Sequence, residues 1–133
     1  MGFEAGFLPS ALVVEAQSSS IFVGLTLMSP EALKKTQPES GNIIKYVFDG
    51  VELTRETQCE SFGSVMDLAI GGGAGVLFAG INSKLVAFDF SLTRLHEVQG
   101  QILVYKVKAA GKDSVIVTDA MKSLTVYSYN GGG

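Results

Sequence analysis

The sequence has one cysteine, one histidine and few charged residues. Cys59 has no second cysteine to pair with among the 133 residues, so neither a disulfide framework nor a cysteine-based metal site can form within the chain. A reducing compartment, the cytosol or the nucleus, fits this composition. Charged residues make up 17% of the chain and the net charge is −3, so no basic stripe is present to follow a phosphate backbone. Direct nucleic-acid binding is therefore not expected.

Signals for export or membrane attachment are also lacking. Glu4 stands where a signal peptide needs positive charge, the first lysine is Lys34, and Gly6 fails the myristoylation pattern. The longest uncharged stretch, residues 68–83, is rich in glycine and too short to span a bilayer. We therefore expect no contact with a membrane.

Motifs for catalysis are missing as well: G-x-S-x-G, H-E-x-x-H and a Walker lysine do not occur. His96 in "RLHEVQ" is expected at the surface, and Glu97 beside it would point to the opposite face of a strand. An enzyme would need His96 and at least two carboxylates within about 4–6 Å of one another. Four aspartates at strand ends or turns are instead expected to accept hydrogen bonds from local backbone amides: Asp67, Asp89, Asp113 and Asp119. The sequence predicts no enzyme, no cofactor and no metal site.

Apolar residues are plentiful, at 47% of the chain, and they recur in a repeat. "VLFAGINSKLVAFDF" at 76–90 aligns with "VIVTDAMKSLTVYSY" at 115–129, at an offset of 39. The alignment places Val76 with Val115, Leu77 with Ile116, Leu85 with Leu124, and Phe88 with Tyr127. "SIFVGLTL" and "NIIKYVFD" form a weaker earlier copy, separated by a loop in which "SPEALKK" could make one helical turn.

The apolar runs have the composition and length of β-strands, because they are rich in Val, Ile, Leu, Phe and Tyr and end at Gly, Asn, Asp or Ser. The expected strands are 11–15, 21–27, 42–48 and 51–58, then 65–70, 76–81, 85–90 and 94–98, then 103–109, 114–118 and 124–129. Four short strands about every 40 residues are typical of β-propeller blades, which stack face to face because one blade cannot bury both of its faces alone. We therefore predict an all-β partial propeller over residues 1–133, with blades at about 8–60 and 61–99 and an incomplete blade at about 100–130. The chain is expected to be part of a larger protein and to self-associate through open sheet edges.

The glycine-rich loop "IGGGAG" at 70–75 has the outline of a dinucleotide site, with Asp89 following the next apolar run. A dinucleotide fold needs a helix after the glycines. The residues that follow favour a strand, and no room remains for a helical crossover. The corresponding loop, "AAGKDS", keeps one glycine. The sequence thus predicts a turn between two antiparallel strands.

Two turns recur at corresponding places of the repeat. Each is expected to be either a solvated turn or a loop that faces a protein partner, because blade loops commonly carry recognition. The residues concerned are Asn82, Ser83, Lys84, Met121, Lys122 and Ser123.

The amino-acid sequences of these repeats resemble those of consecutive blades in a known family. "FAGINSKLVAFDF" and "VIVTDAMKSLTVYSY" are similar to blades in the large subunit of the damaged-DNA-binding complex, where an "INS" turn and a "GD-L-M-(K/R)-S" turn occupy these places. The resemblance covers about residues 8–130. Ala120 departs from the family's Leu, and the fourth strand at 93–99 is shortened. Two related members of the wider family therefore remain as alternatives: the largest subunit of the cleavage and polyadenylation specificity factor and a splicing factor three-b subunit.

The resemblance implies a non-enzymatic scaffold, the adaptor of a cullin-4 type RING ubiquitin ligase linked to DNA repair. It implies a three-propeller protein in which this chain lies in the C-terminal propeller. The implied partners are substrate receptors of the WD40 type, with cullin bound by other parts of the protein and nucleic acid contacted only indirectly. The implied location is the nucleus and cytoplasm. A sister would instead be a scaffold for mRNA 3′-end processing or splicing.

Overall fold

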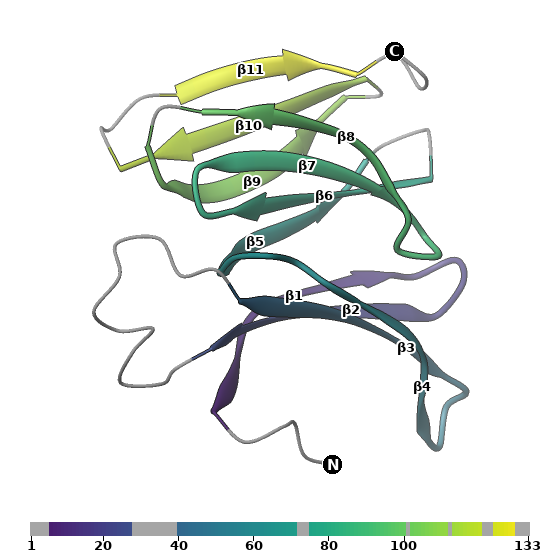
Figure 1. Ribbon diagram of the computed structural model, residues 1–133. Coiled ribbons are helices and arrows are strands. Elements are labelled where there is room, and N and C mark those ends of the chain that lie inside the picture. Colours follow the sequence, from purple (N-terminus) through teal and green to yellow (C-terminus); the bar gives the residue numbers. More distant parts are fainter. Residues whose placement is uncertain are drawn as a thin grey trace.

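The chain folds into three antiparallel β-sheets that lie one above another (Figure 1). The computed structural model describes residues 6–27, 40–71, 75–100, 102–111, 113–120 and 124–129. All eleven regular elements in these ranges are strands, so the all-β class expected from the sequence is confirmed.

Strands that follow one another in the chain pair side by side within each sheet. The first sheet has the order β1 (Phe7–Glu15), β2 (Ser20–Leu27), β3 (Gly41–Phe48), β4 (Leu53–Glu60). The second has the order β5 (Val65–Ile70), β6 (Val76–Ile81), β7 (Lys84–Asp89), β8 (Arg94–Gln99). The third, with three strands in the described ranges, consists of β9 (Val104–Ala110), β10 (Ser114–Asp119) and β11 (Leu124–Ser128), with β10 in the middle.

Each strand expected from the sequence is found, with small changes at the ends. β1 begins at Phe7 instead of residue 11, and β4 covers Leu53–Glu60 instead of 51–58. The helical turn expected in "SPEALKK" lies outside the described residues.

The repeat alignment at a constant offset of 39 is wrong for one strand pair. Ile70 pairs with Leu77, seven residues on, whereas its counterpart Ala109 pairs with Val115, six residues on. The turn before β10 is thus one residue shorter than the turn before β6, and Leu77 corresponds to Val115 instead of Ile116. A slip of one residue moves every side chain of a strand to the other face. Val115 therefore faces the core, while Ile116 lies on the opposite face of the third sheet.

The turn interpretation of the glycine loop is confirmed. β5 and β6 are antiparallel neighbours, and the Gly71 N–H donates to the Val76 carbonyl at 2.7 Å. A direct antiparallel hairpin leaves no place for the crossover helix of a dinucleotide fold. Residues 72–74 of the loop lie outside the described residues.

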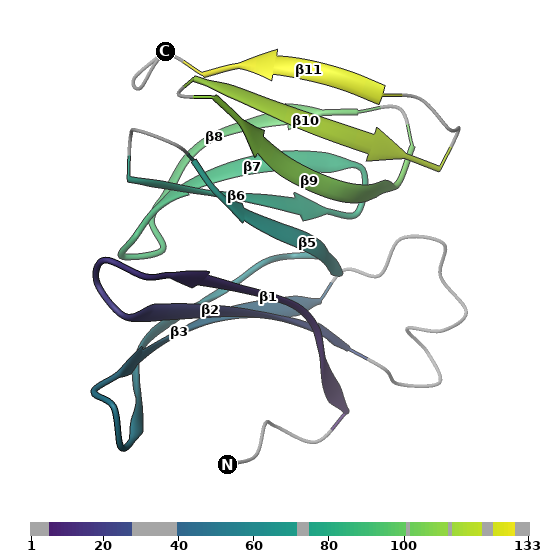
Figure 2. The same cartoon turned by 180° about the vertical axis from the view of Figure 1, so that it is seen from behind.

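The sheets stack through apolar faces, and their first strands come together. β5 contacts both β1 and β9, as the rear view also shows (Figure 2). One core cluster lies between the first and second sheets and includes Phe22, Ile43, Leu68, Leu77, Val86 and Phe88. A second cluster lies between the second and third sheets and includes Phe78, Leu85, Val104, Val107, Val115 and Val117. All six residues of β6 are buried, because the middle sheet is covered on both faces.

Side-chain hydrogen bonds join the first strands across the sheet boundaries. The Ser10 hydroxyl on β1 donates to the Val65 carbonyl on β5 at 2.7 Å. The Val107 N–H on β9 donates to the Asp67 carboxylate on β5 at 2.8 Å. The line β1–β5–β9 is therefore held by specific polar contacts as well as by apolar packing.

Each first strand carries a β-bulge at the same place. One residue is skipped by the partner strand between Pro9 and Ala11, between Val65 and Asp67, and between Val104 and Lys106. Bulges bend a strand and increase its twist. The three sheets therefore share a local backbone feature that the sequence comparison does not predict.

Glycines in β2 and β6 permit the first strands to approach closely. A Cβ at Gly24 would lie 2.7 Å from Val65 Cβ, and a Cβ at Gly80 would lie 2.7 Å from Val104 Cγ1. Thr118 occupies the corresponding place in β10, since Gly80 pairs with Asp67 while Thr118 pairs with Lys106. At both contacts between neighbouring sheets, a glycine in the second strand of one sheet therefore faces the first residue of the next sheet's first strand.

Within the described ranges, no helix is long and apolar enough to cross a membrane.

Candidate binding cleft between the second and third sheets

The predicted turn at Asn82 lies at a junction between sheets. Asn82 has a positive φ of 53°, in the left-handed region that asparagine tolerates. Its N–H donates to the Ser64 carbonyl at 3.0 Å, and its side-chain Oδ1 accepts from the Ser64 N–H at 3.1 Å. Its carbonyl accepts from the Val104 N–H at 2.8 Å. Asn82 therefore connects the segments that lead into β5 and β9.

The other two described residues of this turn are also bonded within the chain. Ser83 is 4% exposed, and its hydroxyl accepts from Gln99 Nε2 at 2.6 Å while its carbonyl accepts from the Gly100 N–H at 2.7 Å. Lys84 is half-exposed and its Nζ lies 3.2 Å from a Glu97 carboxylate oxygen. A partner would therefore meet Lys84 more readily than Ser83. The corresponding residues of the other predicted turn, Met121, Lys122 and Ser123, lie outside the described residues.

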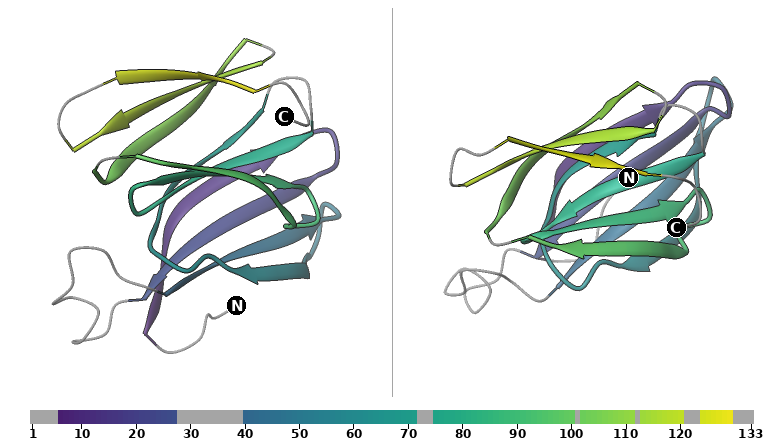
Figure 3. Two further views of the ribbon diagram at one scale, coloured as in Figure 1. Left: turned by 45° about the horizontal axis from the view of Figure 1, so that its top comes forward. Right: turned by 90° about the horizontal axis from the view of Figure 1, so that it is seen from above.

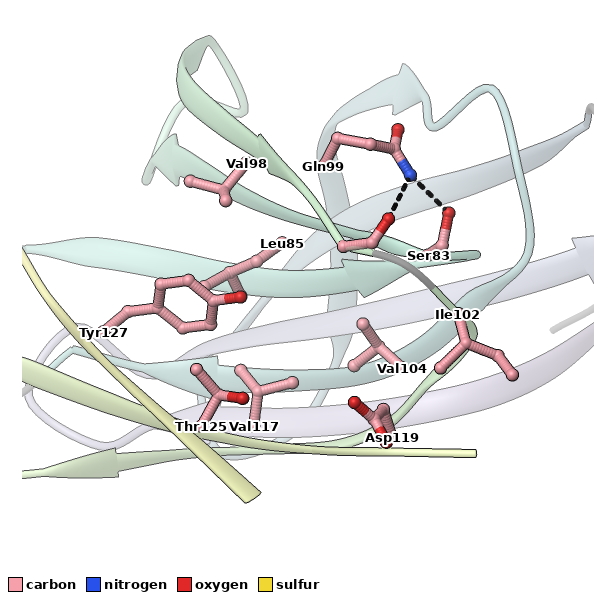
Figure 4. Close-up of a pocket in the computed structure, with 11 residues that line it drawn as sticks. Ser83, Leu85, Val98, Gln99, Ile102, Val104, Val117, Asp119, Thr125 and Tyr127 are labelled. Carbon is pink, nitrogen blue, oxygen red and sulfur yellow. Dashed lines mark hydrogen bonds between the residues drawn. The ribbon is translucent and has the colours of Figure 1, made fainter. Parts of the chain in front are cut away.

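A cleft opens beside this turn, between the second and third sheets, and we name it the β8–β11 cleft (Figure 4). Its wide end has a volume of about 320 Å³ and its narrow end one of about 70 Å³. Leu85, Val98 and Tyr127 line both ends. The wide end also contains Ser83, Gln99, Gly100, Ile102, Val104, Val117, Asp119 and Thr125. The wide end thus combines an apolar floor with several polar groups and one acidic residue, Asp119.

Aromatic rings close the narrow end of the cleft. The His96 ring lies edge-on to Tyr129 at 5.9 Å between centroids, and Tyr129 lies edge-on to Phe78 at 5.4 Å. The adjacent Glu97 carboxylate is turned toward Lys84 and Arg94. His96 therefore contributes to the wall of the cleft. No group of three or more His, Cys, Asp or Glu side chains in the described ranges is placed to hold a metal ion.

Three of the four aspartates predicted at strand ends or turns differ in what surrounds their carboxylates. Asp89 Oδ1 accepts from the N–H groups of Ser91 and Thr93, both at 2.9 Å, as expected for a local turn. Asp67 instead bonds to Val107 N–H in the next sheet, 40 residues away in the chain. Asp119 lines the cleft. The sequence predicts the local bond, but it contains no signal for the bond between sheets.

Arg94 occupies the boundary between the first and second sheets at the outer side. Its guanidinium lies 5.4 Å from the Phe88 ring centroid and 5.7 Å from that of Phe62, and it donates to the Ser61 carbonyl at 2.8 Å. Cation–π contact and a charge-assisted hydrogen bond therefore act together here. No local sequence pattern indicates this role of Arg94, because its partners come from a connecting segment and from another strand.

The lone thiol is a structural group. Cys59 is half-buried against the core between the first and second sheets, and burial raises the pKa of its thiol. A raised pKa keeps the thiol protonated and weakly nucleophilic.

Comparison of the chain with protein-family models and with curated proteins finds no match. The fold and the cleft define an all-β protein of three stacked antiparallel sheets with a groove between two of them.

Proposed function

We propose that the chain supplies three consecutive blades of a β-propeller in a non-enzymatic protein-binding scaffold. The single observation that carries this proposal is the convergence of the first strands. β1, β5 and β9 pack side by side, each with a bulge at the same place, while the later strands of each sheet lie farther out (Figure 3). Sheets arranged with their first strands together and their faces stacked are the arrangement of propeller blades around a central axis.

We further propose that the scaffold is the adaptor of a cullin-4 type ubiquitin ligase, acting in the nucleus and cytoplasm in DNA repair. The support for this step is the resemblance of the two repeated turns to that family, together with the blade-like sheets. Substrate receptors of the WD40 type would bind through loops and blade faces. The exposed Lys84 side chain, beside the cleft, is available for such contacts. The scaffold would contact nucleic acid only through its partners.

Affinity purification of the tagged protein from cells, followed by mass spectrometry, tests the adaptor proposal. We expect cullin and WD40-type receptors to co-purify, and the tag alone serves as the control. Recovery of polyadenylation or splicing factors in their place would overturn the adaptor and favour a sister scaffold. A preparation that enriches none of these proteins would contradict both assignments.

A further inference from the structure

Phe62, in the segment that connects β4 to β5, is an aromatic residue held at the surface. It is 68% exposed, whereas Ser61, Gly63 and Ser64 around it are buried. The Ser61 N–H donates to the Gly41 carbonyl at 3.0 Å, and the Ser61 hydroxyl donates to the Gly63 carbonyl at 2.6 Å. These bonds fix the backbone on both sides of Phe62, so a rigid turn presents the ring to solvent.

The backbone of Phe62 is also strained. Its φ is 57°, in the left-handed region that a bulky side chain rarely adopts. Leu92 has a φ of 65°, but its side chain is buried in the core between the first and second sheets, and this burial offsets the strain. The Phe62 ring gains little burial within the described part of the chain. Strain of this kind is found at binding sites, where the surrounding structure enforces it.

A line of contacts connects Phe62 to the turn that the sequence predicts as a partner-facing loop. The Arg94 guanidinium lies 5.7 Å from the Phe62 ring centroid, and its Nη1 lies 3.1 Å from Glu97 Oε1. Glu97 Oε2 lies 3.2 Å from Lys84 Nζ in that turn. All three charged side chains are partly exposed. Phe62, Arg94, Glu97 and Lys84 therefore form one continuous surface, which we name the Phe62 surface.

The charges of the Phe62 surface favour an acidic partner group at Lys84. Glu97 is shared between two cations, Arg94 and Lys84. The neighbouring Glu60 carboxylate accepts from the Phe62 N–H at 3.3 Å, so it lies beside the backbone of the turn. Lys84 is at the end of the line of contacts away from this carboxylate, and it is the more exposed of the two cations. Opposite charges across an interface select and orient the partner.

We propose that the Phe62 surface binds a partner protein, with the Phe62 ring inserted into an apolar pocket of that protein and a carboxylate on the pocket rim paired with Lys84. Aromatic anchors in partner pockets carry much of the binding energy of an interface, and a group already held in its bound conformation loses little entropy. The inference rests on the proposed protein-binding function, for which it names a surface. It holds for any class of protein partner.

Photo-crosslinking in cells tests the proposal. The tagged 133-residue chain carries benzoylphenylalanine in place of Phe62. A matched chain carries it in place of Phe48, an exposed phenylalanine at the end of β3 opposite to Gly41. We expect an adduct with a partner protein at position 62 and none at position 48. Mass spectrometry should locate the attached partner residue in an apolar pocket with Asp or Glu at its rim. Lys84→Glu should lower the adduct yield at least about fivefold, because like charges would then face each other.

Substitutions of Phe62 separate recognition from folding. Asparagine tolerates the left-handed region, so Phe62→Asn should leave the urea midpoint unchanged or higher. The same variant should lower recovery of the crosslinked partner in affinity purification at least about tenfold, because the aromatic anchor is lost. Phe62→Tyr retains the ring and should recover the partner normally. Phe48→Ala is the control and should also recover it normally.

Several results would overturn the proposal. They are an adduct yield at position 62 no higher than at position 48, a yield that Lys84→Glu does not change, and an attached partner residue outside any apolar pocket. An adduct between two copies of the chain would assign the surface to self-association instead. Unchanged partner recovery by Phe62→Asn would show that the ring is not the anchor. A Lys84-dependent adduct with a protein other than cullin or a WD40-type receptor would support this surface and count against the adaptor, so the two proposals can fail separately.

Discussion

At the scale of single residues, carboxylates hold the turns that lead from one strand to the next. Asp49 Oδ1 accepts from the N–H groups of Val51 and Glu52, both at 2.8 Å, in the turn before β4. Asp89 does the same before β8. Glu15 accepts from the Gln17 and Ser18 N–H groups in the turn before β2. These bonds lower the pKa of the Asp49 and Glu15 carboxyls, with the Glu52 and Gln17 amides as the largest causes respectively.

The lowered pKa of Asp49 predicts a pH-dependent contribution to stability. The ionised carboxylate is favoured by folding, so its contribution is present above the ordinary pKa of 3.8 and is lost as the pH falls through the folded value. Asp49→Asn should therefore be less stable than the original chain at pH 7, and the difference should shrink as the pH is lowered from 3.8 through the folded value of the pKa. Urea unfolding at pH 7 and across this lower range measures the difference. Val51→Ala is the control, and a difference that stayed constant with pH for Asp49→Asn would contradict the charge explanation.

Residue-level prediction from sequence succeeds where the partner is nearby in the chain. An aspartate at a strand end has amides within reach in its own turn, and Asp89 uses them. The partners of Asp67 and Arg94 are distant in the sequence and become adjacent only when the sheets stack, so no local sequence pattern predicts the roles of these two residues. The same holds for Ser83, which is buried by Gln99 and Gly100 instead of being free in a solvated turn.

At the scale of elements, the contact between neighbouring sheets depends on glycines in second strands. A Cβ at Gly80 would lie 2.7 Å from Val104 Cγ1 and 3.1 Å from Val107 Cγ2. The fixed backbone of two packed sheets leaves little room for adjustment, so a methyl group here forces strain.

Gly80→Ala should therefore lower the free energy of unfolding by about 1–3 kcal/mol. Urea denaturation monitored by circular dichroism measures the change. Val104→Ala provides the matched background, because it removes the crowded methyl groups. The cost of Gly80→Ala should fall in that background, and equal costs in both backgrounds would show that crowding against Val104 is not the cause.

The positions of the strands could be predicted because strand composition and the Gly, Asn, Asp and Ser residues that bound the strands are local signals. The observed strand ends differ from the expected ones by only a few residues. The register of β10 could not be predicted, since a loop that is one residue shorter still aligns apolar residues with apolar residues. Val115 and Ile116 are both apolar, so hydrophobicity alone cannot decide which of them faces the core. The three bulges could not be predicted from the sequence either, because the residues at the bulge positions, Ser10, Met66 and Tyr105, have no common side-chain character.

At the scale of the whole molecule, Arg94 fastens the second sheet to the first. It contacts the Phe88 ring of the second sheet and the Phe62 ring in the segment that connects β4 to β5, and it donates a hydrogen bond to the Ser61 carbonyl in the same segment. Its ion pair with Glu97 lies within β8 and is exposed, so it adds little.

Arg94→Gln should lower the free energy of unfolding by about 1–3 kcal/mol, because it removes the cation–π contacts and the charge-assisted bond to Ser61. Arg94→Lys should recover only part of this loss, since an ammonium lacks the planar group that stacks on rings. Arg55→Gln, which removes an exposed arginine 5.9 Å from the Tyr46 ring, is the control and should cost less than about 1 kcal/mol. Equal losses for Arg94→Gln and Arg55→Gln in thermal or urea unfolding would argue against a fastening role.

The number of sheets and the burial of both faces of the middle strands follow from the repeat and from the apolar composition of 76–90. The β8–β11 cleft does not, because its walls come from strands of two different sheets and depend on how far those sheets diverge. Self-association through open edges remains a prediction, which sedimentation at rising concentration checks.

The stacking of the three sheets has a consequence for the order in which parts of the molecule unfold. Within the described residues, the β5–β8 sheet has a neighbouring sheet on both faces, whereas the other two sheets each have one on a single face. In a stack of this kind, stability is close to a sum over adjacent layers. Amide protons of β6 and β7 should therefore exchange with solvent more slowly than those of β3 and β10, and the protein should fray from its two ends toward its centre.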